Sequence, residues 1–192
     1  YIEQIMVVGS NEKFAGAART YTIEAMMGDG KALQAGTSHN LGQNFSKAFG
    51  TRFLTQDGTL EHPWQTSWGV STRMVGGVIM THGDDKGLVL PPRLAPVQAI
   101  IVPIWKNDSE KAAVKEMVVR VEQTLIAAGV RAKADLSEQE TAGWKFNEYE
   151  MRGVPLRIEI GPKDVEKNAV VFARRDRPGK EGKQFGIPAD DV

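Results

Sequence analysis

A polar segment at residues 67–73, SWGVSTR, carries side chains that suit an anionic ligand. It lies between two apolar stretches, where buried polar groups need hydrogen-bonding partners. The guanidinium of Arg73 can contact a phosphate through two N–H groups or stack on a purine, and Trp68 and Gly69 could form the wall and floor of a small pocket. Arg73 could equally be a structural residue paired with a carboxylate such as Glu24. The segment therefore predicts a site for a polyanionic ligand at a strand end and leaves a structural ion pair open.

A second polar segment places Gln34, Thr37 and His39 just before an expected helix. The free N–H groups and the dipole of a helix start bind anions, so these three side chains could surround one. The alternative is a capping segment, with Thr37 or Ser38 as the N-cap and His39 half-buried and hydrogen-bonded. Taken alone, this segment favours the capping interpretation.

Two acidic residues beside a histidine, in His82-Gly-Asp84-Asp85, raise the possibility of a metal site. Neighbouring residues on an extended chain point to opposite sides, so both carboxylates rarely bind one ion without a special loop. The favoured interpretation is a turn that leads into the following connection.

A basic run at residues 174–183 contains five basic and two acidic residues. Its position after an expected strand suits contact with RNA phosphates, although a solvated loop has the same composition. Trp144, Phe146 and Tyr149 add rings that could stack on unpaired bases or pack an amphipathic helix. The sequence contains no Walker motif and no dinucleotide-binding glycine pattern. If the chain binds ATP, the ligand would therefore lie on an antiparallel sheet and not on a phosphate loop.

The composition limits the classes of protein to which the chain could belong. Its 192 residues allow one large or two small domains, and 24 basic residues balance 24 acidic residues, so nucleic-acid binding needs a local patch. The absence of cysteine excludes a disulfide scaffold and a thiolate zinc site and fits a reducing compartment. No apolar run is long enough to span a membrane. The start at Tyr1 reads like the middle of a domain, so we expect a piece of a longer protein.

Hydrophobic periodicity and turn residues predict the elements that position these segments. In the first half we expect a hairpin of strands 20–27 and 31–36, a short helix at 40–49, strands at 51–55 and 61–67, and a helix at 71–80. The last segment is apolar and contains glycines, so it could be a buried helix or a strand, and we favour the helix.

Three prolines between Pro91 and Pro96 predict a domain boundary, because they stop a helix and stiffen the chain. The apolar run 97–104 then suits a buried parallel strand. A helix capped by Asp108 or Ser109 is expected to run to Ala128, with Gly129 as its C-terminal stop. Its buried stripe is expected to consist of Val114, Met117, Val118, Val121 and Leu125. Further expected elements are strands 130–135, 155–160 and 169–173 and a helix at 141–152. This alternation predicts a small α/β domain with a largely parallel sheet.

These patterns occur in one order, and together they resemble prolyl-tRNA synthetases of the archaeal and eukaryotic-like type. The motifs that carry the resemblance are EKFAG (12–16), TYTIE (20–24), QAGTSHNLGQNF (34–45), SWGVSTR (67–73), the segment 81–92, GWKF (143–146), GVPLR (153–157) and EIGP (159–162). The family implies a class II aminoacyl-tRNA synthetase of mixed fold class, α+β and α/β. Residues 1–96 would form the C-terminal part of its antiparallel-sheet catalytic domain, and residues 97–192 would form its α/β anticodon-binding domain.

The resemblance also implies a function, which is the ATP-dependent activation of L-proline and its transfer to tRNA(Pro) by a proline–tRNA ligase. It implies ATP contacts for Gln34, Thr37, Ser71 and Arg73. Of these, Gln34 would also lie near the magnesium ion on ATP, and Arg73 would be the catalytic arginine of the third class II motif. The proline pocket would contain His39, together with Trp68 and Gly69. Anticodon bases would be read by Glu150, Arg157 and Lys180.

The same resemblance implies a homodimer in the full-length enzyme, a cytoplasmic location, no membrane partner and no zinc site within this chain. The first two class II motifs are expected upstream of Tyr1. The segment Gly9–Glu12 is shorter than its counterpart in the family, so we expect a shortened loop near the proline pocket. Two alternatives stay open: a non-catalytic RNA-binding or regulatory paralogue, against which the retained polar residues argue, and a free α/β ligand-binding domain.

Overall fold

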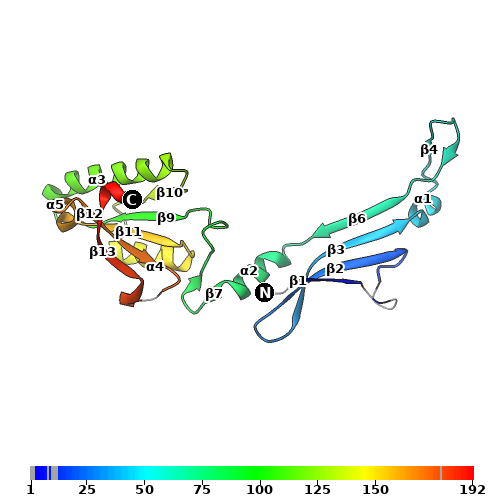
Figure 1. Cartoon of the computed structure of the whole chain (residues 1–192), viewed down its shortest axis with the longest axis horizontal. Coiled ribbons are helices and arrows are strands. Elements are labelled where there is room, and N and C mark those ends of the chain that lie inside the picture. The colour runs from blue at the N-terminus through cyan, green and yellow to red at the C-terminus, as the bar shows by residue number, and fades with distance from the viewer. Residues whose placement is uncertain (1–2, 8, 10–12, 178) are drawn as a thin grey trace. The chain divides into compact units, whose positions relative to one another are not determined.

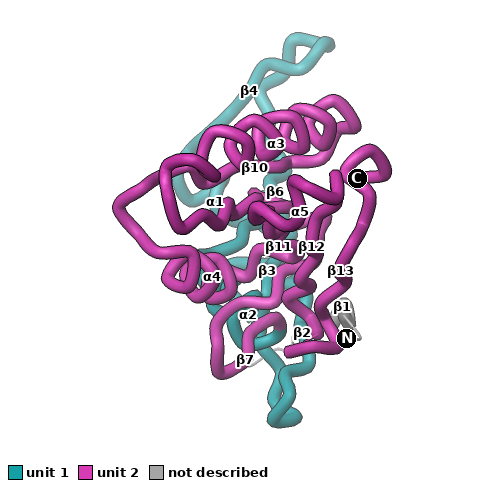
Figure 2. Tube along the Cα trace, turned by 90° about the vertical axis from the view of Figure 1, so that its left-hand side faces the viewer, with its two compact units in different colours: residues 1–81 teal, residues 82–192 magenta. Residues whose placement is uncertain are grey.

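The computed structural model describes residues 3–7, 9, 13–177 and 179–192. The chain divides into two compact units, residues 1–81 and residues 82–192 (Figure 2). Residues 10–12, which belong to the loop expected to be short, lie outside the described residues. In the part of the chain that is described, no helix is both long enough and apolar enough to cross a membrane.

The first unit is built on a four-stranded antiparallel sheet with the strand order β1-β2-β3-β6 (Figure 1). Its strands are β1 (Glu3–Val7), β2 (Arg19–Met26), β3 (Ala32–Gly42) and β6 (Gln65–Val70). The predicted hairpin is confirmed as β2 and β3. The strands predicted at 51–55 and 61–67 become the short pair β4 (Phe53–Leu54) and β5 (Leu60–Glu61), followed by β6.

Strand β3 is longer than predicted, and the helix after it is shorter. β3 continues through Gly42 because it pairs with β2 on one side and with β6 on the other. Its backbone groups are therefore already used in the sheet and cannot start a helix. The helix predicted at 40–49 is confined to α1 (Asn44–Ala48). The expected N-cap at Thr37 or Ser38 is thus wrong, since both lie within a strand, whereas the half-buried, hydrogen-bonded state expected for His39 is confirmed.

The helix predicted at 71–80 is confirmed as α2 (Arg73–Thr81), but it is not buried in this chain. Val75 is 62% exposed and Ile79 is 53% exposed. Among the first-unit residues whose burial is described, which excludes strand β1, Ala17 is the only buried apolar residue. That part of the sheet therefore displays most of its side chains.

The second unit is built on a five-stranded mixed sheet with the order β10-β9-β11-β12-β13. Its strands are β9 (Ala99–Pro103), β10 (Ala132–Ala134), β11 (Leu156–Ile160), β12 (Ala169–Arg174) and β13 (Lys183–Pro188). β9 runs parallel to β10 and β11, but β12 and β13 are antiparallel to their neighbours, so the prediction of a largely parallel sheet is wrong. The connection from β11 to β12 holds only the short helix α5 (Pro162–Glu166), which cannot make the crossover that a parallel pair requires.

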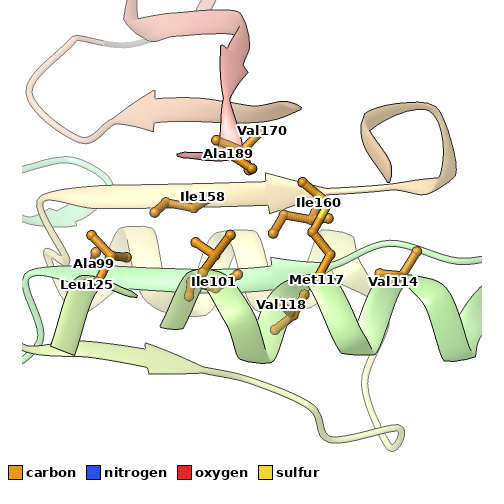
Figure 3. Close-up of a cluster of buried hydrophobic side chains, with 11 residues drawn as sticks. Ala99, Ile101, Val114, Met117, Val118, Leu125, Ile158, Ile160, Val170 and Ala189 are labelled. Carbon is orange, nitrogen blue, oxygen red and sulfur yellow. The ribbon is translucent and has the colours of Figure 1, made fainter. Parts of the chain in front are cut away.

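Two helices pack on opposite faces of this sheet, with β9 buried between them. Ile101 points toward α3 (Asp108–Ala127), and the predicted stripe of α3 is buried against it (Figure 3). Ile100 points to the other face, where α4 (Ala142–Met151) packs through Phe146. Strand alternation explains this arrangement, because successive side chains point to opposite faces. The apolar run predicted as a buried parallel strand is therefore confirmed.

The ends of α3 differ slightly from the prediction. The N-cap is Asn107, whose side chain accepts a hydrogen bond from the backbone N–H of Glu110 at 3.1 Å, so the expected cap at Asp108 or Ser109 is wrong. Both of those residues lie in the first turn of the helix. The predicted stop is confirmed, because Gly129 adopts φ 81°, which favours glycine after a helix.

A hairpin of β7 (Gly83–Asp84) and β8 (Gly87–Leu88) comes before the proline-rich segment and belongs to the second unit. Beyond it, the N–H of Leu90 donates to the carbonyl of Gly153 at 3.3 Å. The compact division falls after Thr81 because this stretch packs on the second unit. The domain boundary at residues 96 and 97 stays a prediction.

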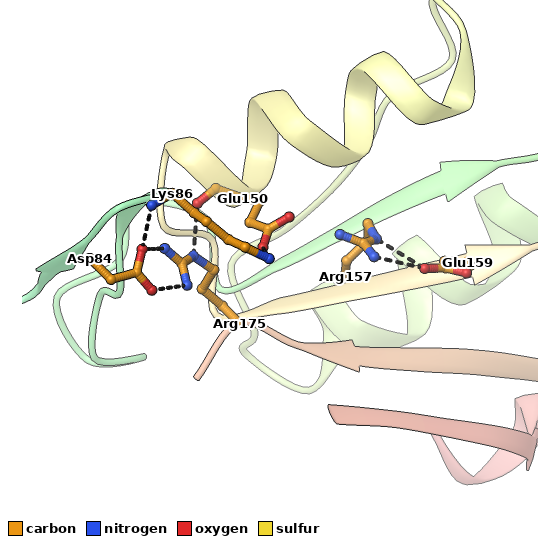
Figure 4. A network of polar contacts seen from close by, with 6 residues as sticks. All are labelled: Asp84, Lys86, Glu150, Arg157, Glu159 and Arg175. Atoms are coloured by element: carbon orange, nitrogen blue, oxygen red, sulfur yellow. Dashed lines mark hydrogen bonds and ion pairs between the residues drawn. The ribbon is translucent and has the colours of Figure 1, made fainter. Parts of the chain in front are cut away.

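An ion pair between Asp84 and Arg175 fixes the β7–β8 hairpin to the sheet. Arg175 donates from Nη1 to Oδ2 at 2.8 Å and from Nη2 to Oδ1 at 2.6 Å (Figure 4). These hydrogen bonds hold the pKa of Asp84 well below its usual range. The carboxylate is thus a structural partner in a turn, and no three His, Asp or Glu side chains of the described residues form a group that could hold a metal ion.

Replacing Ile101 by Ala is expected to lower the free energy of unfolding by about 2–5 kcal/mol, because the change leaves a cavity between β9 and α3. Ile126 near the end of α3 is 54% exposed and provides a matched control. Ile126→Ala should change the free energy by less than about 0.5 kcal/mol. Urea unfolding followed by circular dichroism measures both values. Equal losses would contradict the proposed core.

The Asp84–Arg175 pair is expected to make stability depend on pH. Because Arg175 lowers the pKa of Asp84 in the folded state, the pair stabilises the fold above the ordinary aspartate value of 3.8, and this stabilisation is lost as the pH falls below it. Between about pH 6 and about pH 3, urea unfolding should show a steeper loss for the unchanged chain than for Asp84→Asn. Parallel pH profiles would argue against this role for the pair.

Candidate functional sites

One cavity of the first unit gathers all seven residues to which the family resemblance assigns contacts with ATP and proline. It has a volume of about 380 Å³ and lies among β3, β6 and the start of α2. The seven residues in its lining are Gln34, Thr37, His39, Trp68, Gly69, Ser71 and Arg73. The structure therefore brings the two polar segments of the sequence into one site, which we call the ATP cavity.

A β-bulge in β3 decides which side chains share a face of the sheet. Side chains alternate along a strand, so Gln34 and Thr37, three positions apart, would normally point to opposite faces. Ala35 is an extra residue without a partner on β2, so it forms a β-bulge. The bulge shifts by one residue which side chains of β3 point to each face of the sheet. Gln34 therefore comes to the same face as Thr37 and His39.

The register between β3 and β6 supplies the other half of the site. Thr37 lies directly opposite Gly69, and opposing residues share a face of the sheet. Trp68 lies opposite Ser38, which is the alternate position, so its side chain belongs to the other face. There it is 75% exposed and also lines an apolar cavity of about 730 Å³. Trp68 borders both cavities, and its place in the proline pocket stays a prediction.

Arg73 begins α2 and reaches β3. Its Nη1 donates to the backbone carbonyl and to Oε1 of Gln34, both at 3.4 Å, and its backbone N–H donates to Oγ of Ser71 at 3.3 Å. Glu24 accepts a hydrogen bond from Thr22 instead, and no carboxylate among the described residues pairs with Arg73. The alternative interpretation, in which Arg73 forms a structural ion pair with a carboxylate such as Glu24, is therefore wrong. An exposed guanidinium that keeps its charge uncompensated is suited to an anionic ligand.

His39 is half-buried and held from two sides. Its Nδ1 lies 2.9 Å from Oγ1 of Thr20, and its ring centroid lies 5.0 Å from that of Phe14. The site here offers an aromatic wall next to polar atoms, which suits a small ligand that has an apolar ring and charged groups. The alternating threonines Thr20 and Thr22 of β2, both buried, were a signal of this polar face that sequence reasoning missed.

A cavity of about 460 Å³ in the second unit gathers the three residues assigned to anticodon bases, and we call it the RNA cavity. Glu150 comes from the last turn of α4, Arg157 from β11 and Lys180 from the 3-10 turn Gly179–Gly182. The other basic residues in its lining are Lys86, Arg174, Arg175, Arg177 and Lys183. Many donors, one carboxylate and the aromatic ring of Phe185 form a surface suited to single-stranded nucleic acid.

Arg157 is the most firmly held of the three residues assigned to anticodon bases. Its guanidinium lies 4.2 Å from the ring centroid of Phe146, and its Nε and Nη2 donate to Oε1 of Glu159 at 3.0 and 2.9 Å (Figure 4). Glu159 is buried, and its Oε2 accepts from Nζ of Lys183 at 2.9 Å. One buried carboxylate thus fixes two cations of the RNA cavity and leaves Nη1 of Arg157 available to a ligand.

Sequence reasoning missed Lys86, which lines the RNA cavity, and Glu159, which holds two of its cations. Arg157 and Glu159 are two positions apart on a strand, so they share a face, and their opposite charges could have revealed the pair. No comparable signal marked Lys86, because it is 64 residues away from its partner Glu150. The basic run 174–183 is partly structural, since several of its members pair with carboxylates.

The comparisons with known proteins concern the chain as a whole and its second half. The family described as Anticodon binding domain matches residues 98–192. The chain is 66% identical over 176 residues to the proline–tRNA ligase, chloroplastic/mitochondrial, of Arabidopsis thaliana, an alignment that covers 92% of this chain and 32% of that protein. It is 58% identical over 181 residues to the proline–tRNA ligase of Roseiflexus sp., covering 94% of this chain and 37% of the relative.

The fold gives the same result. The structure of prolyl-tRNA synthetase from Cryptosporidium parvum complexed with L-proline and AMP matches with a TM-score of 0.84 and 46% identity, over 98% of this chain and 40% of that chain. The chain thus spans about a third to two fifths of the length of the proteins it matches. Over that length, the chain is homologous in sequence and fold to prolyl-tRNA synthetases.

Proposed function

We propose that the chain is the part of a proline–tRNA ligase that carries the third class II motif and the anticodon-binding domain, with a boundary near residue 96. The observation that carries this proposal is the convergence of the assigned residues. Segments far apart in sequence supply seven residues to the ATP cavity and three to the RNA cavity. The relatives named above are proline–tRNA ligases, which supports the same activity.

In this proposal the first unit takes part in the activation of L-proline. The carboxylate of proline attacks the α-phosphate of ATP, and pyrophosphate leaves, which yields prolyl-adenylate. Catalysis of such a step depends mainly on positioning and on stabilisation of negative charge. Arg73 carries into the cavity a positive charge that no carboxylate of the described residues pairs, and the hydroxyl groups of Thr37 and Ser71 are further donors to ATP.

The proline pocket would lie at the His39 end of the ATP cavity. Phe14 and His39 offer ring surfaces for an apolar ligand ring, and Gly69 leaves room beside them, since a Cβ there would meet no atom within 4 Å. The Cryptosporidium relative was solved with L-proline and AMP in one case and with halofuginone and AMPPNP in another. Ligands of this size and charge fit the chemistry of the cavity.

Magnesium would arrive bound to ATP, where it would neutralise phosphate charge. Gln34 fits a supporting role, because an amide oxygen is a hard ligand of the kind that Mg²⁺ accepts. Its Oε1 is 3.4 Å from Nη1 of Arg73, so the two residues would approach the same phosphates.

The second unit would read the anticodon of tRNA(Pro). Arg157 and Lys180 supply donors and Glu150 supplies an acceptor, and such groups recognise the edges of unpaired bases. The proposal further includes a homodimer of the full-length enzyme and no zinc site in this chain. A cytoplasmic location stays a prediction, since the Arabidopsis relative is named chloroplastic/mitochondrial.

In the full-length enzyme, Arg73→Ala is expected to slow proline-dependent ATP–pyrophosphate exchange by about 10²-fold or more, the usual cost of losing a donor that stabilises developing charge. Arg52→Ala is the control, because Arg52 is an exposed arginine of the same unit outside the ATP cavity. Exchange at nearly the original rate in R73A would exclude Arg73 from the ATP site. If the unchanged enzyme shows no exchange at all, the non-catalytic paralogue is favoured.

Arg157→Ala is expected to spare ATP–pyrophosphate exchange and to weaken charging of tRNA(Pro) by about 1–3 kcal/mol in kcat/KM, the value of one good base contact. Arg93→Ala is the control, since Arg93 is an exposed arginine of the same unit outside the RNA cavity. Steady-state aminoacylation measures the difference. Unchanged charging in R157A would count against anticodon reading, and a chain that binds no tRNA would favour the free ligand-binding domain.

A further inference from the structure

The β7–β8 hairpin contributes a residue to the RNA cavity. The anticodon assignment names residues of α4, β11 and the 3-10 turn, yet Lys86 at the tip of the hairpin also lines this cavity. Its Nζ donates to Oε1 of Glu150 at 3.1 Å (Figure 4). The hairpin therefore reaches the one carboxylate in the lining of the RNA cavity.

The hairpin and the end of α4 are held by the same arginine. Arg175 pairs with Asp84 of the hairpin through two hydrogen bonds, and its Nε donates to the backbone carbonyl of Glu150 at 2.9 Å. The Arg175 side chain is only 5% exposed. Lys86 in turn donates its backbone N–H to Oδ1 of Asp84 at 2.9 Å. Arg175 thus fixes the backbones that carry Lys86 and Glu150 relative to each other.

Two glycines allow the β7–β8 hairpin to approach the backbone at the end of α4 closely. Gly87 has φ 130°, and a Cβ there would lie 2.3 Å from the carbonyl oxygen of Met151. Gly153 has φ 73°, and a Cβ there would lie 2.5 Å from Cβ of Leu88. Neither position accommodates a side chain without moving backbone. The hairpin therefore packs directly against the last turn of α4, beside Glu150.

The Lys86–Glu150 pair is poorly placed to serve stability. The Lys86 side chain is 57% exposed and that of Glu150 is 26% exposed, and ion pairs this accessible contribute little to folding. The lysine holds Oε1, whereas Oε2 of Glu150 accepts no hydrogen bond from any described residue. One oxygen is thus anchored, and the other is left for a ligand in the cavity.

From these contacts we infer that Lys86 is a positioning residue of the RNA cavity, which orients the Glu150 carboxylate so that Oε2 accepts an N–H of an unpaired base. The inference rests on the proposed anticodon-binding function. It makes the β7–β8 hairpin part of the machinery for base recognition. Loss of Lys86 should let the carboxylate rotate and should weaken the preference for the correct base.

The test is the binding of anticodon stem–loop RNA to the 192-residue chain, measured by fluorescence anisotropy with stem–loops that carry each base at each anticodon position. Lys86→Met should bind the cognate stem–loop about three- to tenfold more weakly, a fraction of the cost of a lost base contact. Its discrimination between cognate and substituted stem–loops should fall. Lys86→Arg keeps a cationic donor and should restore both. Lys133→Met, at an exposed lysine outside the cavity, is the matched control and should change neither.

A double-variant cycle separates positioning from a direct phosphate contact. If Lys86 acts through Glu150, then Lys86→Met should add little to the loss already caused by Glu150→Gln. Additive losses, or a Lys86→Met variant with unchanged base discrimination, would overturn the inference. Binding that is unaffected by Glu150→Gln and by Arg157→Ala would instead overturn the proposed function and the inference with it. Weakening by those two variants but not by Lys86→Met would overturn the inference alone.

Discussion

Successive side chains of a β-strand point to opposite faces of the sheet, and both candidate sites depend on this alternation. In the second unit it lets β9 bury Ile101 against α3 and Ile100 toward α4. In β11 it turns Ile158 into the core and Arg157 toward the RNA cavity. In the first unit the same rule would separate Gln34 from Thr37, and only the bulge at Ala35 brings them to one face.

Charge pairing divides the basic residues into structural and available groups. The chain has no net charge, so affinity for anions must come from cations that lack a carboxylate partner. Arg175 is occupied by Asp84, and Lys183 by Glu159. Arg73 has no such partner among the described carboxylates, and Arg157 keeps Nη1 available although Glu159 holds its other donors. The carboxylates thus position the cations that a ligand would meet. Their negative charge also reduces the positive potential around those cations.

Predictions from the sequence were correct where a local rule sets the structure. They were wrong where pairing between distant segments sets it. The stripe of α3 and its stop at Gly129 follow from helical period and from glycine at a positive φ, and both are confirmed. The helix expected at 40–49 gave way to β3, because two neighbouring strands compete for the same backbone groups. The prediction of a largely parallel sheet was wrong at β12, which pairs antiparallel with β11. The connection containing α5 is too short for the crossover that a parallel pair needs.

The sequence alone determined which residue types are present, the order of the motifs and hence the family resemblance, because these features depend only on covalent order and local preference. It also indicated that Arg73 and the segment around Gln34 belong to one function. Only the tertiary structure decided that Arg73 has no partner among the described carboxylates, that Asp84 is a structural anchor and that Lys86 meets Glu150. The physical reason is that ion pairs form between atoms a few ångströms apart, and the fold, not the spacing in sequence, sets those distances.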